Sequence, residues 1–226
     1  PLFTLCEMLG IDEEERPRIK LWMHHLELAS QFLANPWQTF LSEPLFPFRF
    51  NSVVKEMFAY GERVMADRRT NPREDLLTVI AQSKLDGEIL SQEYLDGSWL
   101  LIIFAGNDTS RNSLSGTIRL MTEFPDQRAM VLEDPSLIPK MSEEALRMVS
   151  PVIHMRRTAV EDTELNGQSI AKDEKVLLWY GAANRDPELF PDPDSFNMQP
   201  DNVEKHLEFG HGVHKCLGSR IAKMQL

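Results

Sequence analysis

Apolar side chains recur at intervals of three and four residues from the start of the chain to about residue 150, a spacing typical of amphipathic helices. Prolines, glycines and capping residues divide this part into segments. Three prolines, Pro36, Pro44 and Pro47, predict a loop after the second helix. The expected helices cover residues 1–10, a segment that starts after residue 12, and residues 51–69, 73–84, 91–124, 126–133 and 139–150.

The pattern changes after Pro151, where short extended segments replace the helical spacing. Asn166-Gly167 is a dipeptide that favours a tight hairpin turn between two strands. Candidate strands cover residues 152–165, 168–170 and 176–180, and a meander rich in Pro, Asp and Asn covers residues 181–204. The expected fold class is therefore mainly α with a small β section.

The composition favours a globular protein and argues against several other classes. Among 226 residues, 24 are basic and 35 are acidic, and the net charge of −11 argues against a nucleic-acid partner, which needs clustered positive charge. The longest apolar run, residues 99–105, is too short to cross a membrane. The two cysteines, Cys6 and Cys216, lie far apart in sequence, so we expect a reducing, cytoplasmic setting, no disulfide framework and a buried Cys6.

Both ends of the chain lie inside patterns that have no natural boundary. The sequence starts with Pro1, and it stops at Leu226 within residues 221–226, which continue a helical pattern. We therefore expect a fragment of a longer protein that is incomplete at both ends.

A single cysteine lies in a glycine-rich loop near the end of the chain. Residues 209–218 read FGHGVHKCLG, and the glycines permit backbone conformations that other residues resist. A thiol near amide groups and cations loses its proton readily, so it can bind a metal at neutral pH. The loop resembles the haem-binding loop of the cytochrome P-450 family, F-x-x-G-x-(basic)-x-C-x-G, in which the cysteine binds the iron. This resemblance implies a metal-binding Cys216 and cofactor-binding roles for Phe209, Gly210, Gly212, His214 and Gly218.

A second polar segment lies within the longest predicted helix. Residues 105–110 read AGNDTS, and these residue types are poor helix formers that predict an interruption. The segment resembles the oxygen-binding groove of the same family, (A/G)-G-x-(D/E)-T-(T/S). The resemblance implies that the small residues Ala105 and Gly106 leave room at the haem face. It also implies a catalytic pair, in which Thr109 bonds oxygen or water and Asp108 relays protons.

Glu144 and Arg147 form the pattern E-x-x-R on a helix, a spacing that is common for an ordinary ion pair. In the family this pair is a buried structural lock behind the haem loop, and the resemblance implies that role here. The family often adds an arginine from the meander at the position where this chain has Ser195. The lock is therefore expected to be a pair or to find another partner.

The β section contains the expected edge of the cofactor site. The family places on a haem propionate the arginine two residues before the alanine of this segment, which points to Arg157. His214 fits the second propionate, and Arg156 is expected to be solvated. The resemblance also implies a substrate cavity lined by apolar and neighbouring residues of the long helix and the first strand. They are Leu101, Ile102, Ala105, Val152, Ile153, His154 and Met155.

The motifs together imply a haem-thiolate monooxygenase with the cytochrome P-450 fold, of which residues 1–226 form a partial domain. The implied cofactor is heme b, whose thiolate ligand favours O–O cleavage, and the implied substrates are O2 and a small hydrophobic molecule. Electrons come from NAD(P)H through a ferredoxin reductase and a ferredoxin. Residues 106–113, 154–165, 179–180 and 184–186 resemble bacterial alkane hydroxylases. Terminal hydroxylation of medium-chain alkanes or fatty acids is therefore expected, and steroid or terpenoid hydroxylation is the alternative.

Basic residues gather near the end of this acidic chain. They are Lys205, Lys215, Arg220 and Lys223, against one acid, Glu208. A solvated helix face is the common explanation of such a pattern. The local reversal of charge nevertheless predicts a docking surface for an acidic ferredoxin.

Two other classes of protein are alternatives. A zinc site has candidate ligands in His206, His211, His214 and Cys216, although the C-x-x-C and H-x-x-x-H spacings of zinc sites do not occur there. A non-catalytic helical interaction domain is expected to have lost the cysteine or the acid–alcohol pair, and this chain has both. As a fragment, the chain is expected to bind haem weakly, if at all, and to be inactive by itself.

Overall fold

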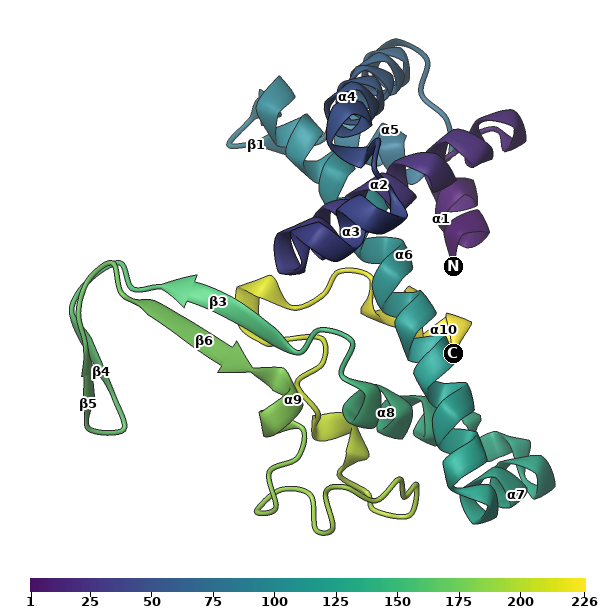
Figure 1. Ribbon diagram of the computed structural model, residues 1–226, viewed down its shortest axis with the longest axis vertical. Helices are drawn as coiled ribbons and strands as arrows, with labels where there is room; N and C mark the ends of the chain where they lie inside the picture. Colours follow the sequence, from purple (N-terminus) through teal and green to yellow (C-terminus); the bar gives the residue numbers. More distant parts are fainter. The chain divides into compact units, whose positions relative to one another are not determined.

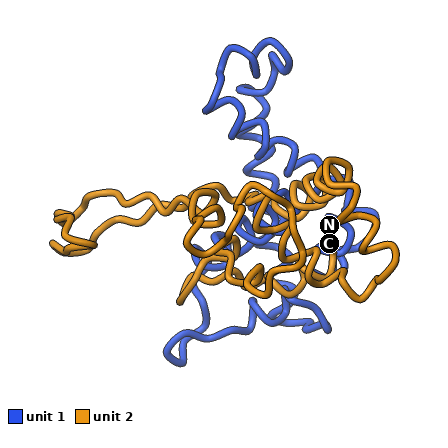
Figure 2. Tube along the Cα trace, turned by 90° about the horizontal axis from the view of Figure 1, so that it is seen from below, with its two compact units in different colours: residues 1–108 blue, residues 109–226 orange.

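The computed structural model describes all 226 residues, Pro1–Leu226, as helices and loops with three short antiparallel strand pairs (Figure 1). The predicted fold class, mainly α with a small β section, is confirmed. The chain divides into two compact units, residues 1–108 and residues 109–226 (Figure 2). No helix combines the length and the apolar character that a membrane crossing requires.

Unit 1 consists of helices and one small hairpin. Its elements are α1 (Leu2–Met8), η1 (Glu13–Glu15), α2 (Arg16–Ala34), α3 (Pro36–Ser42), α4 (Phe46–Thr70), α5 (Leu76–Gln82), β1 (Lys84–Leu85), β2 (Glu88–Ile89) and the first part of α6 (Gln92–Glu123). In its core the ring centroids of Trp22 and Tyr60 lie 5.2 Å apart, and those of Tyr60 and Trp99 lie 5.8 Å apart. Gly61 permits this packing, because a Cβ atom there would lie 2.6 Å from Trp99 Cδ1. Cys6 is buried in the same core, as predicted.

Two of the three prolines predicted to form a loop lie in the first turns of helices. Pro36 lies in the first turn of α3, where the Asn35 side chain accepts a hydrogen bond from the Gln38 N–H. Pro47 lies in the first turn of α4. The predicted loop is therefore wrong at Pro36 and Pro47, and it is confirmed only at Pro44, which lies in a turn between α3 and α4. The physical reason is that proline lacks only a donor that the first helical turn leaves unpaired anyway.

Two further boundaries of unit 1 differ from the prediction, and one agrees with it. Asp12 forms no side-chain cap, and the acidic run after it is the 3-10 helix η1. Asp75 caps α5 by accepting from the Thr78 N–H at 2.7 Å, so this helix starts later than predicted. The turn predicted at Asp86-Gly87 is confirmed, with positive φ values of 53° and 86°.

Helix α6 continues through residues 105–110, so the predicted interruption is wrong. Further along the helix, Ser113 donates to the Thr109 carbonyl at 2.9 Å, and Thr117 donates to the Ser113 carbonyl at 2.7 Å. Hydroxyl groups that bond the preceding turn in this way are satisfied within the helix, so they do not have to open it.

Unit 2 combines helices with two strand pairs. Its elements after α6 are α7 (Pro125–Glu133), η2 (Pro135–Leu137), α8 (Ile138–Val149), β3 (His154–Thr158), β4 (Thr163–Leu165), β5 (Gln168–Ile170), β6 (Lys175–Trp179), α9 (Tyr180–Ala183), η3 (Val203–Lys205), η4 (Gly212–His214) and α10 (Ser219–Gln225). Strand β3 pairs with β6, and β4 pairs with β5. The strand predicted over residues 152–165 is therefore two strands with different partners. The predicted hairpin turn at Asn166-Gly167 is confirmed, with φ values of 50° and 78°.

A hydrophobic core holds α8 in place within unit 2. Its residues come from α6, α7, α8 and the meander: Leu120, Val131, Met141, Ala145, Met148, Phe196 and Met198. Gly116 of α6 permits a close approach to α8, because a Cβ atom there would lie 2.4 Å from Val149 Cγ2. The meander predicted over residues 181–204 is mostly irregular, and it joins this core through Phe196 and Met198. This packing fixes the helix that carries the E-x-x-R pair.

Candidate functional site

Main-chain hydrogen bonds close the cysteine loop. Gly210 and Gly212 have φ values of 66° and 70°, in the left-handed region that favours glycine. The Cys216 N–H donates to the Phe209 carbonyl at 2.8 Å, and the Lys215 N–H donates to the Gly212 carbonyl at 3.1 Å. Cys216 is an exposed free thiol. The backbone alone thus presents the sulfur at the surface of the loop.

Two side chains of the same loop are apolar and exposed. Val213 is 97% exposed and Leu217 is 93% exposed. A Cβ atom at Gly218 would lie 3.9 Å from the Cys216 Sγ, so the glycine keeps space next to the sulfur. An exposed thiol in a loop with exposed apolar side chains fits a large apolar group that has a metal at its centre. The sulfur can bind the metal, and Val213 and Leu217 can cover part of the apolar surface of the group.

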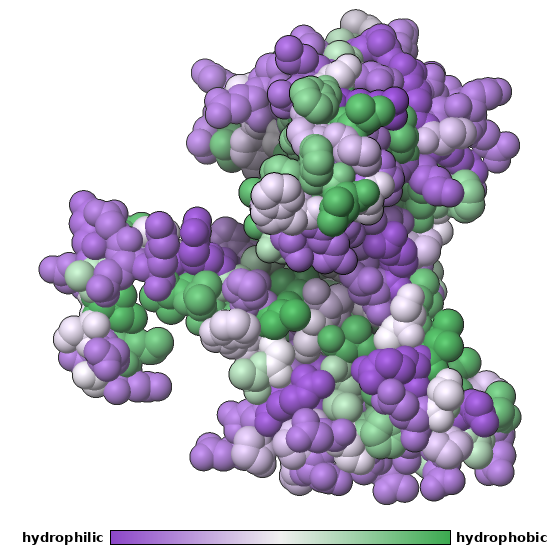
Figure 3. Space-filling model, viewed as in Figure 1, coloured by the Kyte–Doolittle hydropathy of each residue, from purple (hydrophilic) through white to green (hydrophobic).

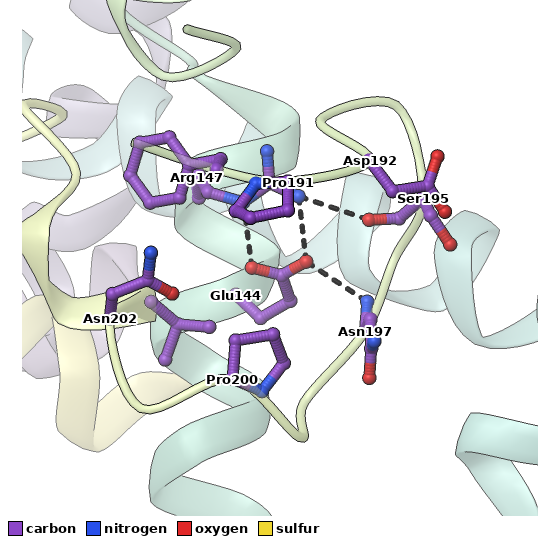
Figure 4. A pocket seen from close by; sticks show the side chains of 10 residues that line it. Glu144, Arg147, Pro191, Asp192, Ser195, Asn197, Pro200 and Asn202 are labelled. Atoms are coloured by element: carbon purple, nitrogen blue, oxygen red, sulfur yellow. Dashed lines mark hydrogen bonds and ion pairs between the residues drawn. The ribbon is translucent and has the colours of Figure 1, made fainter. Parts of the chain in front are cut away.

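Glu144 and Arg147 of α8 form a buried ion pair. Arg147 Nε donates to Glu144 Oε2 and Arg147 Nη2 donates to Glu144 Oε1, both at 2.7 Å. Both residues are almost completely buried, with exposed fractions of 1% for Glu144 and 2% for Arg147. Figure 4 shows the two side chains facing each other in a pocket lined by the meander.

Main-chain groups of the meander complete this pair. Arg147 donates to the carbonyls of Asn184 at 2.9 Å, Pro193 at 2.7 Å and Ser195 at 3.0 Å. Glu144 accepts a further bond from the Asn197 N–H at 3.0 Å (Figure 4). Where the family often has another arginine, this chain therefore uses the backbone of Ser195. Every charge of the pair is compensated, which is the condition for burying it.

Asn184 connects the meander to the cysteine loop. Its Oδ1 accepts from the Leu207 N–H at 2.7 Å, and its Nδ2 donates to Ser150 Oγ at 2.9 Å. Ser150 follows α8 with a positive φ of 43°. The sequence reasoning assigned no site role to either residue. The available signal for Ser150 was a short polar residue at the end of a predicted helix, directly before Pro151.

Glu208 is buried, so it does not belong to the surface on which the sequence reasoning placed it. Its exposed fraction is 6%, its Oε1 accepts from the Val152 N–H at 2.9 Å, and its Oε2 is buried without a hydrogen-bond partner. Burial raises the pKa of the Glu208 carboxyl to about 7, although the bond from the Val152 N–H and the nearby Ser150 hydroxyl act in the opposite direction.

His206 and Lys223 meet at one carboxylate. His206 Nδ1 lies 3.2 Å from the Glu208 backbone nitrogen, from which it accepts, and His206 Nε2 lies 3.0 Å from Glu143 Oε2. Lys223 also donates to Glu143. Burial alone would raise the pKa of Glu143, but the bonds from His206 and Lys223 outweigh it and hold the pKa below its ordinary value. No three His, Cys, Asp or Glu side chains are grouped so that they could hold a metal ion, so the structure does not bring the four candidate zinc ligands together.

Strand alternation separates two of the predicted site residues. In the β3–β6 ribbon, the His154 ring stacks on Trp179 with 5.0 Å between the ring centroids. Side chains alternate along a strand, so His154 shares a face with Arg156, whereas Arg157 shares the other face with Met155. Figure 3 shows apolar side chains gathered along this ribbon. A site that uses Arg157 therefore has Met155 as its neighbour on the strand, in place of His154.

The predicted residues of the long helix occupy both units. The helix positions of unit 1 are Leu101, Ile102, Ala105, Gly106 and Asp108, and Thr109 begins unit 2. Leu101 is exposed, and the open side of Gly106 faces α1, where a Cβ atom would lie 3.2 Å from Leu5 Cδ1. The absence of a side chain at Gly106 thus also allows Leu5 of α1 to pack closely against α6. The joint action of these residues with the cysteine loop stays a prediction.

Of the predicted docking residues, three lie open at the surface. Lys205, Lys215 and Arg220 are exposed. Lys223 is partly buried and pairs with Glu143. Glu208, the one acid in this part of the sequence, is buried. The exposed members of this set of residues are therefore all basic, whereas the sequence had placed one acid among them.

Known proteins resemble this chain over its whole length. A family model described as Cytochrome P450 matches residues 4–226. Linalool 8-monooxygenase from Pseudomonas putida is 37% identical over 226 residues, which are 100% of this chain and 53% of that protein. Methyl-branched lipid omega-hydroxylase from Mycobacterium bovis is 34% identical over 229 residues, which cover 100% of this chain and 51% of that protein. The chain thus spans about half the length of the curated relatives it matches.

A solved structure shows the same fold. Cytochrome P450-153 from Novosphingobium aromaticivorans superposes with a TM-score of 0.80 at 37% identity. The match covers 99% of this chain and 52% of that one. The fold implied by the three sequence motifs is therefore confirmed.

Replacing Arg147 by Ala should lower the free energy of unfolding by about 3–5 kcal/mol, because it leaves the buried Glu144 charge and three carbonyls without their partner. Urea denaturation of the chain measures this change. Arg119→Ala is the matched control: it removes an i,i+4 pair with Glu123 whose side chains are 60% and 48% exposed, and it should cost about 0.5 kcal/mol or less. Similar losses in the two variants would contradict the structural role of the buried pair.

Proposed function

Because the chain belongs to the cytochrome P450 family, we propose that Cys216 binds haem iron and that the whole protein is a monooxygenase that inserts one oxygen atom of O2 into an unactivated C–H bond. The observation that carries this proposal is an exposed thiol, held by main-chain bonds in a glycine-rich loop that meets the haem-binding pattern at every fixed position. We also propose that residues 1–226 form a partial domain of this family in a cytoplasmic protein.

The residues around Cys216 fit heme b. Val213 and Leu217 offer apolar surface beside the thiol, and Gly218 keeps space next to the sulfur. Phe209, Gly210 and Gly212 shape the loop, whereas Arg157 supplies positive charge for one propionate and His214 a contact for the second. When bound, haem with a thiolate ligand supplies activation of O2. The role of the protein is to hold this group, orient the substrate and exclude water.

Two residues of α6 are proposed to take part in proton transfer. Asp108 relays protons from solvent, and Thr109 holds a hydrogen bond to oxygen or water near the reacting atoms. Both follow the small residues Ala105 and Gly106, of which Gly106 packs against Leu5 of α1. Substrate contacts are proposed for Leu101 and Ile102 of unit 1 and for Val152, Ile153, His154 and Met155 of unit 2, of which Met155 shares a strand face with Arg157.

The carbon monoxide difference spectrum of the reduced chain, expressed with haem supplied, tests the cofactor assignment. Any haem that the chain binds should give a long-wavelength Soret band, weak in this fragment, because a thiolate is the proposed iron ligand, and Cys216→Ser should abolish it. Cys6→Ser is the matched control, because this buried thiol is expected to have no part in haem binding and the band should persist. If the chain shows no band, the complete gene product is measured next, and its failure to give a band would refute haem-thiolate ligation.

The proposed reaction is terminal hydroxylation of medium-chain alkanes or fatty acids. Support comes from the alkane-hydroxylase-like segments 106–113 and 154–165 and from a relative named for omega-hydroxylation of a methyl-branched lipid. A second relative is named for a monooxygenase reaction on linalool, which supports a terpenoid, or by extension a steroid, as the alternative substrate class.

A spectral titration of the haem-loaded complete gene product separates these substrate classes. Dodecane or dodecanoic acid should shift the Soret band at lower concentrations than linalool or a steroid, because a cavity for an extended chain excludes branched and fused-ring molecules. Tighter binding of linalool or of the steroid would reject the alkane assignment in favour of the alternative.

Electrons are proposed to come from NAD(P)H through a ferredoxin reductase and an acidic ferredoxin. The docking surface consists of the exposed residues Lys205, Lys215 and Arg220. Opposite charges on two partners speed their encounter, and salt screens this effect.

The double variant Lys215→Glu/Arg220→Glu should slow reduction by ferredoxin about tenfold or more at low salt, because it replaces attraction by repulsion. Stopped-flow kinetics measures the rate, and the difference from wild type should shrink as salt is added. Lys172→Glu changes one exposed charge elsewhere in unit 2 and should leave the rate nearly unchanged. Equal rates for the double variant and the wild type at low salt would reject this docking surface.

A further inference from the structure

Glu208 is a buried carboxyl group to which the proposed function gives no role. It precedes Phe209, whose carbonyl accepts the hydrogen bond from the Cys216 N–H. Its Oε1 accepts from the Val152 N–H at 2.9 Å, and Val152 lies just before β3, the strand that contains Arg157. Glu208 therefore connects the loop that holds the thiol to the strand that is proposed to hold a propionate.

The hydrogen bonds around Glu208 favour its neutral form. Its Oε2 is buried without a partner. The Ser150 hydroxyl has one proton, which it donates to the Arg147 carbonyl at 2.9 Å, and it accepts from Asn184 Nδ2 at 2.9 Å. An ionised Glu208 would compete for that single proton, whereas a protonated carboxyl brings a donor of its own. Protonation therefore satisfies more of the buried groups than ionisation does.

We propose that Glu208 is a positioning residue whose neutral form holds the cysteine loop against the residues that lead into β3, and whose ionisation loosens this junction. The consequence for haem rests on the proposed function. The coupling between ionisation and the loop concerns the protein alone, so it can be tested without the cofactor.

The other charged groups around Glu208 are compensated by their own partners. His206 accepts from the Glu208 backbone N–H but directs its other nitrogen to α8. An ionised Glu208 carboxylate would therefore be a buried charge without a cation. The pairs that compensate the neighbouring groups are His206 and Lys223 with Glu143, and Arg147 with Glu144.

Proton linkage gives the direction of the pH dependence. The ordinary pKa of this carboxyl is 4.5, and burial raises it to about 7 in the folded protein. Between pH 4.5 and about pH 7, the Glu208 carboxyl keeps its proton when the junction is closed and releases it when the junction opens. The junction therefore loses stability as the pH rises from about 4.5 to about 7, and it changes little at higher pH.

Amide hydrogen exchange of the 226-residue chain, corrected for the intrinsic pH dependence of exchange, tests the proposal. Protection of the segments that contain Val152 and Cys216 should fall at least about tenfold from pH 5 to pH 7.5 in the wild type. Glu208→Gln keeps the shape of the side chain but cannot ionise, so its protection should stay nearly constant. Glu204→Gln changes an exposed residue of the same segment and should follow the wild type.

Two results would overturn the proposal. If Glu208→Gln keeps the wild-type pH profile, the titrating group is another one, such as His206, which this variant retains. If the wild-type protection is flat from pH 5 to pH 7.5, ionisation does not loosen the junction, and this result holds even if the variant fails to fold.

The haem-loaded complete gene product tests the link to the cofactor. The share of the long-wavelength carbon monoxide band should fall with rising pH in the wild type and should stay constant in Glu208→Gln. A pH-independent band in the wild type would overturn the positioning role toward haem. A protein that shows no such band at any pH would count against the proposed function and would leave the exchange result as the test of the junction.

Discussion

The buried pair of Glu144 and Arg147 is the interaction on which the arrangement of unit 2 depends. Two full charges leave water here, and this is tolerable only because each donor of the guanidinium and each oxygen of the carboxylate has a partner. Several of those partners are backbone groups of the meander, between Asn184 and Asn197. Since this segment has little regular structure, the hydrogen bonds to the pair, together with the burial of Phe196, define its path.

The same interaction reaches the cysteine loop through a chain of polar contacts. Arg147 bonds the Asn184 carbonyl, and the Asn184 side chain bonds both Leu207 and Ser150. The loop itself is closed by main-chain bonds around glycines, which by themselves restrict its position only weakly. Its position in unit 2 therefore comes from the residues before it, which include Glu208, whose pKa burial raises to about 7.

The surface of unit 2 has exposed apolar and basic side chains, in contrast to its buried polar network. Apolar side chains are exposed beside the thiol and along the β3–β6 ribbon, where a folded protein gains by covering them. The exposed cations Lys205, Lys215 and Arg220 lie in the same part of the chain, while Lys223 is held by Glu143. The proposed cofactor site rests on this thiol and the exposed apolar side chains, and the proposed docking surface rests on these three cations.

The sequence by itself determined the features that depend on near neighbours. Helix periodicity, the Asn166-Gly167 turn, the cysteine loop and the three-residue spacing of the E-x-x-R pair all arise within a few residues, and all appear in the structure. Tertiary structure decided the features that depend on distant partners. Glu208 is buried because Val152 and Ser150 pack around it, and the first strand is divided because its two halves pair with different partners. Burial and strand pairing are set by residues far apart in the chain, so no local pattern encodes them.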